Sequence, residues 1–406
     1  MKFVVAQIGA RRHYAVPALL ETVGMLERFY TDLAGNVGLG RLASAAAGFA
    51  RSSGWLKRLA DRRVPDVIAE KTYTFAGPGL LYTLDRTFGR HDPARQFVSS
   101  LKYSQALGRA MARKGFGNAT HVYSMLGECG PLLGAAKERG LVVISEVYIC
   151  LGTEKILEDE RRRFPGWEPA MPDYAALRRE RVVTDYLFEY SDHFICPSQK
   201  VRDDLLVNCG VKPDRTAVVP YGASSVYLAI ENRPVRGRVL FAGTAELRKG
   251  IHYLAMAAEK LLTKYGPSLT FQIAGDVAET VRAQPICRQL QFLGRIPRSE
   301  MTQQYARADV VVLPTLAEGS AGVAYEALAA GVPVITTPAA GSVIRDGIEG
   351  RIVPERDPEA LAAAIEEITG DREKRHRMAR AARVHATQFT WEKYSDRLVR
   401  ALTSLQ

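Results

Sequence analysis

The sequence predicts an α/β protein of two domains, each built on a doubly wound parallel sheet. Short apolar runs alternate with helical segments in two separate series, which is typical of such sheets. A polar segment with proline and glycine, Glu231–Gly237, lies between the two series and is expected to be a linker. The chain has 406 residues. That length is enough for two domains of roughly 200 residues, each with its own core.

The composition is that of a folded soluble protein. Apolar residues make up 47% of the chain and charged residues 24%, which is ordinary for globular domains. No apolar run approaches the ~18 residues that a membrane-spanning helix needs. The N-terminal stretch MKFVVAQIGARRHY has too short an apolar run for a signal peptide and predicts a first strand. The five cysteines are scattered without a C-x-x-C pair. They are expected to be reduced thiols in a cytoplasmic protein, not a disulfide framework or a metal site.

Positive charge is concentrated in one part of the chain. Of the net charge of +11, residues 41–120 contribute +9, with 14 Lys or Arg against 5 Asp or Glu. Aromatic residues such as Trp55, Phe75 and Phe97 lie between these cations. The segment is therefore either a solvated surface or a surface that meets an anionic membrane or an anionic acceptor. Nucleic acid is not expected as a partner, because no recognised binding motif accompanies the charge.

The first series begins with a strand over Lys2–Ile8, a turn, and a helix over about Ala18–Tyr30. The turn has no G-x-G-x-x-G pattern. It carries four candidate residues instead, namely Gly9, Arg11, Arg12 and His13. Because ligands bind at the carboxyl ends of parallel strands, these residues either face a substrate or are exposed loop residues.

Residues 36–118 predict short helices separated by glycine and proline clusters. The segment is too long for an ordinary connection, so we expect a helical basic insertion that faces the acceptor. A strand over His121–Met125, a helix over Pro131–Arg139 and a strand over Leu141–Glu146 then resume the alternation. Further helical segments and a strand at Ser191–Ser198 lead toward the end of the first domain.

The second series begins at Arg238. It predicts a strand over Val239–Ala242, a loop over Gly243–Gly250, a helix over Ile251–Tyr265 and a strand over Leu269–Ala274. The remaining expected elements are, in order, a strand at Gln291–Pro297, a helix at Ser299–Ala306, a strand at Val310–Leu313, a helix from about Gly322 to Gly331, a strand at Val334–Ile335, and helices at Pro358–Thr369 and Arg372–Thr387.

Two cations and two carboxylates mark the strand-to-helix junctions of this second series. Arg248 and Lys249 end the first loop, where an arginine fork and a lysine point charge suit a diphosphate. Glu318 lies in the loop before the helix at about Gly322, and Glu326 lies about one turn inside that helix. The helix N-terminus attracts anions, while carboxylates accept hydrogen bonds from sugar hydroxyls. Taken alone, each pair also has an ordinary explanation, as solvated charges or as residues that favour a helix start.

The run EGSAGVAYEALAAGVPVITTPAAGSVIRDGIEGRIVP, which starts at Glu318, resembles the donor-binding signature of the retaining family 4 glycosyltransferases. It is most similar to the subgroup whose loop reads EGSA. The resemblance is strong over Val239–Leu402, weak over Thr184–Gly222 and only architectural before Gly117. It implies the GT-B fold, with two Rossmann-like domains and a cleft between them. Residues 1–233 would form the acceptor-binding domain, residues 238–387 the nucleotide-sugar-binding domain, and residues 388–406 a helix crossing back to the first domain.

The resemblance also assigns roles to particular residues. Glu326 would accept hydrogen bonds from the ribose hydroxyls, and Glu318 would contact the transferring sugar. Arg248 and Lys249 would neutralise the leaving diphosphate. The remaining donor-binding residues would be Gly243, Thr244, Gly319, Ser320, Ala321, Gly322, Val323, Arg295 and Ile296, the last two at the base.

Two positions depart from the family pattern. Thr244 stands where many relatives have an arginine, so Arg248 would have to supply that charge. Glu146 stands where relatives often have a histidine that faces the donor sugar. Glu146 either takes that place on the acceptor side or pairs with an arginine of the insertion.

The function that the resemblance implies is a retaining transfer of a hexose from a nucleotide-diphospho-sugar to a hydroxyl of a glycan or lipid-linked acceptor. No D-x-D motif occurs in the chain, so no metal or other cofactor is expected. The protein would work in the cytoplasm, with residues 41–120 at the inner face of the plasma membrane. The alternatives are a non-catalytic nucleotide-sugar-binding protein, a sugar-nucleotide epimerase of the same fold, and a basic membrane- or polymer-binding protein.

Overall fold

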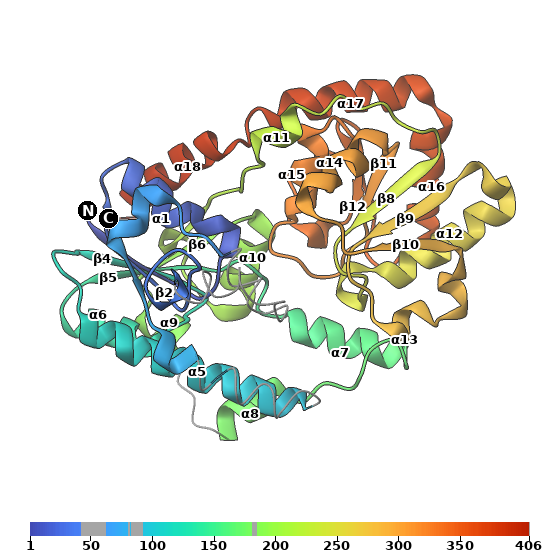
Figure 1. Ribbon diagram of the computed structural model, residues 1–406. Helices are drawn as coiled ribbons and strands as arrows, with labels where there is room; N and C mark the ends of the chain where they lie inside the picture. Colours follow the sequence, from blue (N-terminus) through green and yellow to red (C-terminus); the bar gives the residue numbers. More distant parts are fainter. Residues whose placement is uncertain (42–61, 80–81, 83–91, 181–184, 406) are drawn as a thin grey trace. The chain divides into compact units, whose positions relative to one another are not determined.

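A computed structural model describes residues 1–41, 62–79, 82, 92–180 and 185–405 of the chain (Figure 1). The chain divides into two compact units. The first comprises residues 1–147 and 171–195, and the second comprises residues 148–170 and 196–406. Among the residues that the structure describes, no helix combines the length and the hydrophobicity needed to cross a membrane.

The first sheet has seven strands in the order β3-β2-β1-β4-β5-β6-β7. Their bounds are β1 Phe3–Gln7, β2 Leu26–Thr31, β3 Thr72–Thr74, β4 His121–Met125, β5 Val142–Glu146, β6 His193–Cys196 and β7 Thr216–Val218. The pairs from β3 through β6 are all parallel. A parallel sheet of this length agrees with the doubly wound architecture that the alternating sequence predicts.

The helix expected over Ala18–Tyr30 is wrong in its second half. Helix α1 covers only Ala15–Thr22, and Leu26–Thr31 is strand β2, which pairs with β1. Gly24 has a φ of +69° and provides the turn between the two elements. The aromatic and β-branched residues after Gly24 suit a half-buried strand, and pairing with β1 decides the outcome.

The segment over residues 36–118 contains a strand as well as helices. Strand β3 pairs with β2 at the edge of the first sheet, which the sequence analysis did not anticipate. Helix α5, Pro93–Lys114, agrees with the expected helical character of the segment. Residues 42–61, 80–81 and 83–91 lie outside the described part of the chain.

The helices of the first unit are α1 Ala15–Thr22, α5 Pro93–Lys114, α6 Gly130–Glu138, α8 Tyr174–Glu180 and α9 Tyr186–Tyr190. Two of these helices, α5 and α6, share an apolar core with the sheet. Leu107 and Met111 of α5 and Leu132 of α6 pack with Val4 and Val122 of the strands. All five side chains are fully buried.

The second sheet has six strands in the order β10-β9-β8-β11-β12-β13, and its recorded pairs are all parallel. Its strands are β8 Arg238–Ala242, β9 Thr270–Ala274, β10 Leu290–Gly294, β11 Val310–Leu313, β12 Val334–Thr336 and β13 Gly350–Ile352. The helices of the second unit are α7 Thr153–Arg163, α10 Gln199–Cys209, α11 Ser225–Leu228, α12 Ile251–Tyr265, α13 Glu279–Arg282, α14 Arg298–Arg307, α15 Gly322–Ala329, α16 Pro358–Gly370, α17 Arg372–Ala386 and α18 Trp391–Ser404.

Both faces of the second sheet are buried. Phe241 of β8 and Val312 of β11 belong to one apolar cluster, which includes α12 and α16. Leu240 and Val311, the neighbours of these residues, belong to a second cluster with α15 and α17. Because successive side chains of a strand point to opposite faces, the continuous apolar runs of the sequence predict this two-sided burial.

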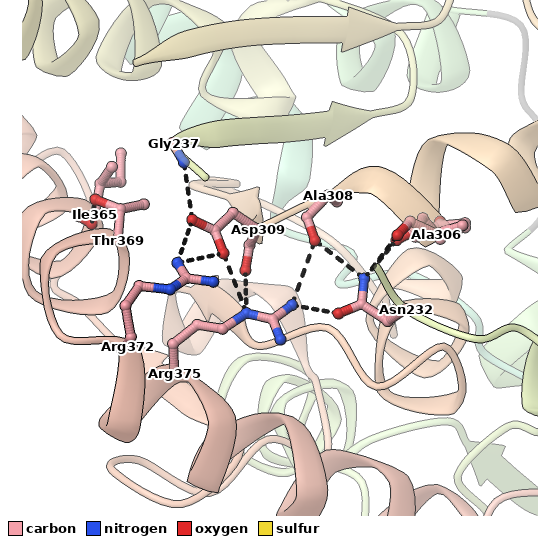
Figure 2. Close-up of polar contacts among 10 residues, drawn as sticks. Asn232, Gly237, Ala306, Ala308, Asp309, Ile365, Thr369, Arg372 and Arg375 are labelled. Atoms are coloured by element: carbon pink, nitrogen blue, oxygen red, sulfur yellow. Dashed lines mark hydrogen bonds and ion pairs between the residues drawn. The ribbon is translucent and has the colours of Figure 1, made fainter. Parts of the chain in front are cut away.

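The expected linker is tied to the second unit by a buried polar network (Figure 2). The amide nitrogen of Asn232 donates to the carbonyl oxygens of residues 305, 306 and 308 at 3.0–3.2 Å, and its oxygen accepts from Arg375. The backbone N–H of Gly237 donates to Asp309 Oδ2 at 2.9 Å. Arg372 and Arg375 extend from α17 and pair with Asp309, which is fully buried. Burial lowers the pKa of Arg375 to about 10.

Replacing Asp309 with asparagine should lower the free energy of unfolding by about 3–5 kcal/mol, because it leaves Arg375 buried without an opposite charge. Urea unfolding followed by circular dichroism measures the change. Asp214→Asn, at an exposed position, is the matched control and should change the unfolding free energy by less than about 0.5 kcal/mol. Equal stability of the two variants would show that the network does not hold the linker.

Candidate functional site

A pocket of about 300 Å³ lies in the second unit. It opens at the carboxyl ends of β8, β9 and β10, where a parallel sheet binds its ligands. Its lining residues are Tyr227, Ala242, Gly243, Thr244, Ala274, Gly275, Asp276, Arg295, Ile296, Arg298, Met301, Tyr305, Val323 and Glu326. The structure therefore brings together six of the predicted donor-binding residues, namely Gly243, Thr244, Arg295, Ile296, Val323 and Glu326.

Glu326 is held in place by buried tyrosines. The hydroxyl of Tyr305, which is fully buried, donates to Glu326 Oε2 at 2.7 Å. Tyr227 packs edge-on against Tyr305, with ring centroids 5.6 Å apart. Burial raises the pKa of Glu326, and the Tyr305 hydroxyl, Arg298 and Tyr227 oppose that shift. One oxygen of an oriented carboxylate thus has a fixed partner, while the other can accept from a ligand hydroxyl.

Because the family resemblance implies that Glu326 accepts from ribose hydroxyls, its raised pKa predicts that binding of such a ligand depends on pH. A protonated carboxyl is a poorer acceptor for ribose hydroxyls, so affinity should fall as the pH drops through a value above the ordinary 4.5 of glutamate. In Tyr305→Phe, which loses a hydrogen bond to the carboxylate, the midpoint should move to higher pH. Calorimetric titration with nucleotide-hexoses at several pH values measures both. Glu326→Gln is the control, and a midpoint that persists in this variant would exclude Glu326 as its source.

Glu318 forms a compact charge cluster with the two predicted cations. Its Oε2 accepts from Arg248 Nη1 at 3.0 Å and also from Lys249 Nζ. Arg248 makes a second ion pair with Glu246 at 2.6 Å. Burial lowers the pKa of Arg248, but Glu318 and Glu246 outweigh this effect and the net shift is upward. The three residues that the sequence analysis assigns to the reacting end of the donor therefore lie together.

Backbone contacts hold the loop of Arg248 against the loop of Glu318. The N–H of Leu316 donates to the Arg248 carbonyl at 2.9 Å, and Arg248 Nη1 donates to the Ala317 carbonyl at 3.2 Å. Gly250 has a φ of +71°, and a Cβ there would lie 1.9 Å from the Pro314 carbonyl oxygen. Only glycine fits this position, which explains the Lys-Gly end of the loop.

The loop from Gly319 to Val323 is packed on both sides. A Cβ on Gly319 would lie 1.7 Å from the carbonyl oxygen of Tyr148, so this residue must be glycine for steric reasons. Ser320 is buried, and its hydroxyl lies 2.9 Å from that of Tyr325. The N–H of Ala321 donates to the Ala340 carbonyl at 3.1 Å and is already engaged. Helix α15 begins at Gly322, and a Cβ on Gly322 would meet open space.

In the first unit, the predicted acceptor-side residues pair with carboxylates at the ends of neighbouring strands. The N–H of Gly9 donates to Asp32 Oδ1 at 2.9 Å. Arg11 pairs with Glu128 at 2.5 Å, and Arg12 pairs with Glu146.

Glu146 is 1% exposed, and its second oxygen accepts from the Tyr123 hydroxyl at 2.7 Å. Within the part of the chain that the structure describes, Glu146 thus pairs with Arg12 of the first turn and accepts from Tyr123.

The backbone of the first turn is unusual. Arg12, His13 and Tyr14 have φ values of 47°, 51° and 61°, so three consecutive non-glycine residues adopt left-handed conformations. Such strain persists where the surrounding structure fixes it, and it gathers at ligand-binding sites. The side chain of His13 is exposed, whereas Tyr14 is fully buried.

The sequence analysis missed several residues around both sites. Tyr305, Tyr227 and Arg298 reach the pocket from helices, and nothing in a helical pattern tells which residue meets a ligand. Asp276 lies two residues after the end of the strand expected at Leu269–Ala274, a signal that could have identified it. Asp32 also follows a strand, but that strand was assigned to a helix.

Comparison with known proteins gives matches to sugar-transferring proteins. Residues 236–371 match the family "Glycosyl transferases group 1". The chain is 28% identical over 263 residues to glycogen synthase of Mycobacterium tuberculosis, covering 62% of each protein. It is 32% identical over 188 residues to D-inositol 3-phosphate glycosyltransferase of Corynebacterium urealyticum, covering 42% of this chain and 44% of the relative. The matches thus span less than two thirds of these relatives.

Solved structures match over the whole chain. Anabaena Alr3699/HepE in complex with UDP superposes with a TM-score of 0.64 at 16% identity, covering 100% of both chains. Sucrose-phosphate synthase from Thermosynechococcus elongatus gives a TM-score of 0.65 at 17% identity, again over 100% of both chains. At such low identity the likeness concerns the fold alone. The fold class predicted from the sequence, two Rossmann-like parallel sheets of the GT-B type, is confirmed.

Proposed function

We propose, from the match of residues 236–371 to the family "Glycosyl transferases group 1", that the chain is a retaining glycosyltransferase. It moves a hexose from a nucleotide-diphospho-sugar to a hydroxyl of a glycan or lipid-linked acceptor. Residues 238–387 bind the donor, residues 1–233 bind the acceptor, and residues 388–406 form a helix that returns to the first domain. The loop at Glu318 belongs to the EGSA subgroup of the family.

The observation that carries this proposal is the arrangement of charges in the second unit. Glu326 of α15 lines the pocket and provides one oriented carboxylate. Arg248 and Lys249 form a charge cluster with Glu318, which lies in the loop just before α15. Ribose hydroxyls donate to Glu326, and the diphosphate lies between Arg248 and Lys249. Arg295 and Ile296 contact the base. A helix N-terminus and two cations can together stabilise the negative charge of a leaving diphosphate.

The acceptor binds at the carboxyl ends of the first sheet. Two Arg–Glu pairs and the left-handed turn of residues 12–14 support this assignment. The pairing of Glu146 with Arg12 and Tyr123 gives it a fixed orientation, so it holds Arg12 toward substrate instead of replacing a histidine directly.

The first experiment incubates the protein with UDP-, GDP- and ADP-hexoses, with and without a panel of glycan and lipid-linked acceptors. Release of nucleoside diphosphate only with an acceptor, and a product whose anomeric configuration matches the donor, supports retaining transfer. An epimerase would convert the donor without an acceptor, and a binding protein would bind donor without turnover. UDP is the first nucleotide to test, because Alr3699/HepE was solved with UDP-glucose.

Metal removal should leave this activity intact, because the two cations and the helix N-terminus take the place of a metal at the diphosphate. Activity measured before and after treatment with EDTA, with Mg²⁺ added back, tests the point. A loss of activity that Mg²⁺ restores would contradict the assignment of diphosphate binding to Arg248 and Lys249.

We further propose that the protein works in the cytoplasm, at the inner face of the plasma membrane. Helix α5 supports this, because it carries five cations and no Asp or Glu. Arg95, Lys102 and Arg109 are exposed and recur every seven residues, which places them on one face of the helix. Such a face attracts anionic lipid headgroups.

Sedimentation with anionic and neutral vesicles tests the membrane proposal. Replacing Arg95, Lys102 and Arg109 with glutamine should weaken binding to anionic vesicles. Unchanged binding would show that this face of α5 does not bind the membrane. The remaining cations of the basic segment include Lys57 and Arg58, which lie in residues 42–61, outside the described part of the chain.

A further inference from the structure

A second pocket of the second unit, about 390 Å³ in volume, shares no lining residue with the nucleotide pocket. Its wall includes Cys150, Ile156 and Leu316 as apolar surfaces, and its charged lining residues are Lys155, Lys200 and Asp204. The volume lies in the range of pockets that bind small molecules. Neither the proposed donor site nor the proposed acceptor site uses these residues.

The two lysines have no recorded ion pair or hydrogen bond through their ammonium groups within the described part of the chain, and both are exposed. The carboxylate beside them is already occupied. Asp204 Oδ2 accepts from the Leu151 N–H at 2.6 Å, and Asp204 Oδ1 accepts from the Asn208 side chain at 2.8 Å. Two lysines therefore line the pocket, and the one lining carboxylate already accepts hydrogen bonds from other groups.

This combination selects a particular ligand chemistry. Two ammonium groups favour a dianion over a single carboxylate, and lysine binds phosphate as a point charge. The apolar wall suits a small organic body attached to that dianion. A phosphomonoester of a small organic molecule has both features.

One wall of the pocket is the reverse side of the loop that carries Glu318. Ala317 lines the pocket, and its carbonyl accepts from Arg248. Ala339 also lines the pocket, and its carbonyl accepts from the Glu318 N–H at 3.1 Å. Cys150 Sγ lies 3.8 Å from the Glu318 carbonyl oxygen. An occupant of the pocket therefore contacts the segments that hold Glu318 and Arg248.

We propose that this pocket binds the phosphomonoester of a small organic molecule between Lys155 and Lys200. Its occupancy changes the affinity of the protein for nucleotide, because the pocket shares the loop that carries Glu318. Any such coupling is reciprocal by thermodynamic linkage: if the pocket ligand changes the affinity for nucleotide, nucleotide changes the affinity for the pocket ligand by the same factor. This inference goes beyond the proposed function and does not depend on which sugar is transferred.

Calorimetric titration with phenyl phosphate, phenol and inorganic phosphate tests the proposal on protein saturated with UDP, so that the diphosphate site is filled. Phenyl phosphate should bind more tightly than either fragment. In the Lys155→Gln/Lys200→Gln variant its affinity should fall at least about tenfold, while UDP affinity measured alone stays unchanged. Adding phenyl phosphate to the wild type should change the UDP affinity by about threefold or more.

The matched control is Lys212→Gln/Lys393→Gln, which removes the same charge from two exposed positions outside the pocket. It should bind phenyl phosphate like the wild type. The assignment of the site would be wrong if both double variants lost the same affinity for phenyl phosphate. It would also be wrong if Lys249→Gln, and not the Lys155/Lys200 variant, abolished phenyl phosphate binding. Binding at the two lysines without any change in UDP affinity would overturn the coupling. If UDP does not bind at all, the proposed function fails, while titration without UDP still tests the phosphomonoester site.

Discussion

Replacing Lys249 with glutamine should lower the rate of sugar transfer by about 10²–10³-fold. Lys249 is 14% exposed at its side chain and pairs with Glu318 beside Arg248. In the proposed reaction its ammonium group neutralises the charge that develops on the leaving diphosphate. A neutral side chain of similar length keeps the packing and removes that charge where it matters most. Substrate affinity should change much less than the rate, because the charge on the diphosphate increases in the transition state.

Initial rates of UDP release in the presence of acceptor measure this effect, with donor concentration varied so that kcat and KM are separated. Lys260→Gln, which removes a half-exposed lysine from the same unit, is the control and should keep the wild-type rate. A KM increase with unchanged kcat would show that Lys249 only binds the donor and does not stabilise the leaving group.

Replacing Glu318 with glutamine should have two opposite effects. The transfer rate should fall by about 10²-fold, because in the proposed reaction the Glu318 carboxylate contacts the transferring sugar. The affinity for UDP should rise, by about three- to tenfold, because Glu318 no longer competes with the diphosphate for Arg248 and Lys249. Glu318 Oε2 accepts from both cations, so in the proposed reaction the donor phosphates compete with this carboxylate for Arg248 and Lys249.

UDP titration and rate measurement on the same preparation of Glu318→Gln test both effects. Glu246→Gln is an informative control, because the Glu246 carboxylate pairs with Arg248 and has no ion pair with Lys249 among the described residues. It should raise the UDP affinity slightly and leave the transfer rate near the wild-type value. Weaker UDP binding in Glu318→Gln would mean that Glu318 holds the two cations in position for the phosphates and does not compete with them.

Most of the second sheet could be predicted from the sequence, because its elements have strong local signals. The expected helix over Ile251–Tyr265 coincides with α12, and the strand expected at Val310–Leu313 coincides with β11. Gly250, whose φ and close contact allow only glycine, marks the start of α12 as the sequence suggests. In these places local propensity and burial favour the same structure.

The first unit was harder to predict because tertiary pairing overrides its local pattern. Leu26–Thr31 continues an apolar series that fits a helix as well as a strand, and pairing with β1 decides between them. That error also concealed Asp32, which directly follows β2 and accepts from Gly9.

The candidate site could be predicted as a set of residues but not as a set of contacts. Spacing and resemblance identify Glu318, Glu326, Arg248 and Lys249. They do not reveal that Glu318 pairs with both cations or that Tyr305 orients Glu326, because those contacts join residues 21 to 70 positions apart. Nor does the sequence show that Arg12 pairs with Glu146, 134 positions away.

The most direct test of the central claim is calorimetric titration of the wild type and of Glu326→Ala with UDP, GDP and ADP and their hexose conjugates. We expect micromolar binding of one nucleotide to the wild type and binding at least about tenfold weaker to Glu326→Ala. Glu300→Ala, at an exposed position of α14, should bind like the wild type. Absence of binding to every nucleotide, or equal binding by Glu326→Ala, would contradict the claim that the pocket at Glu326 holds a nucleotide-sugar donor.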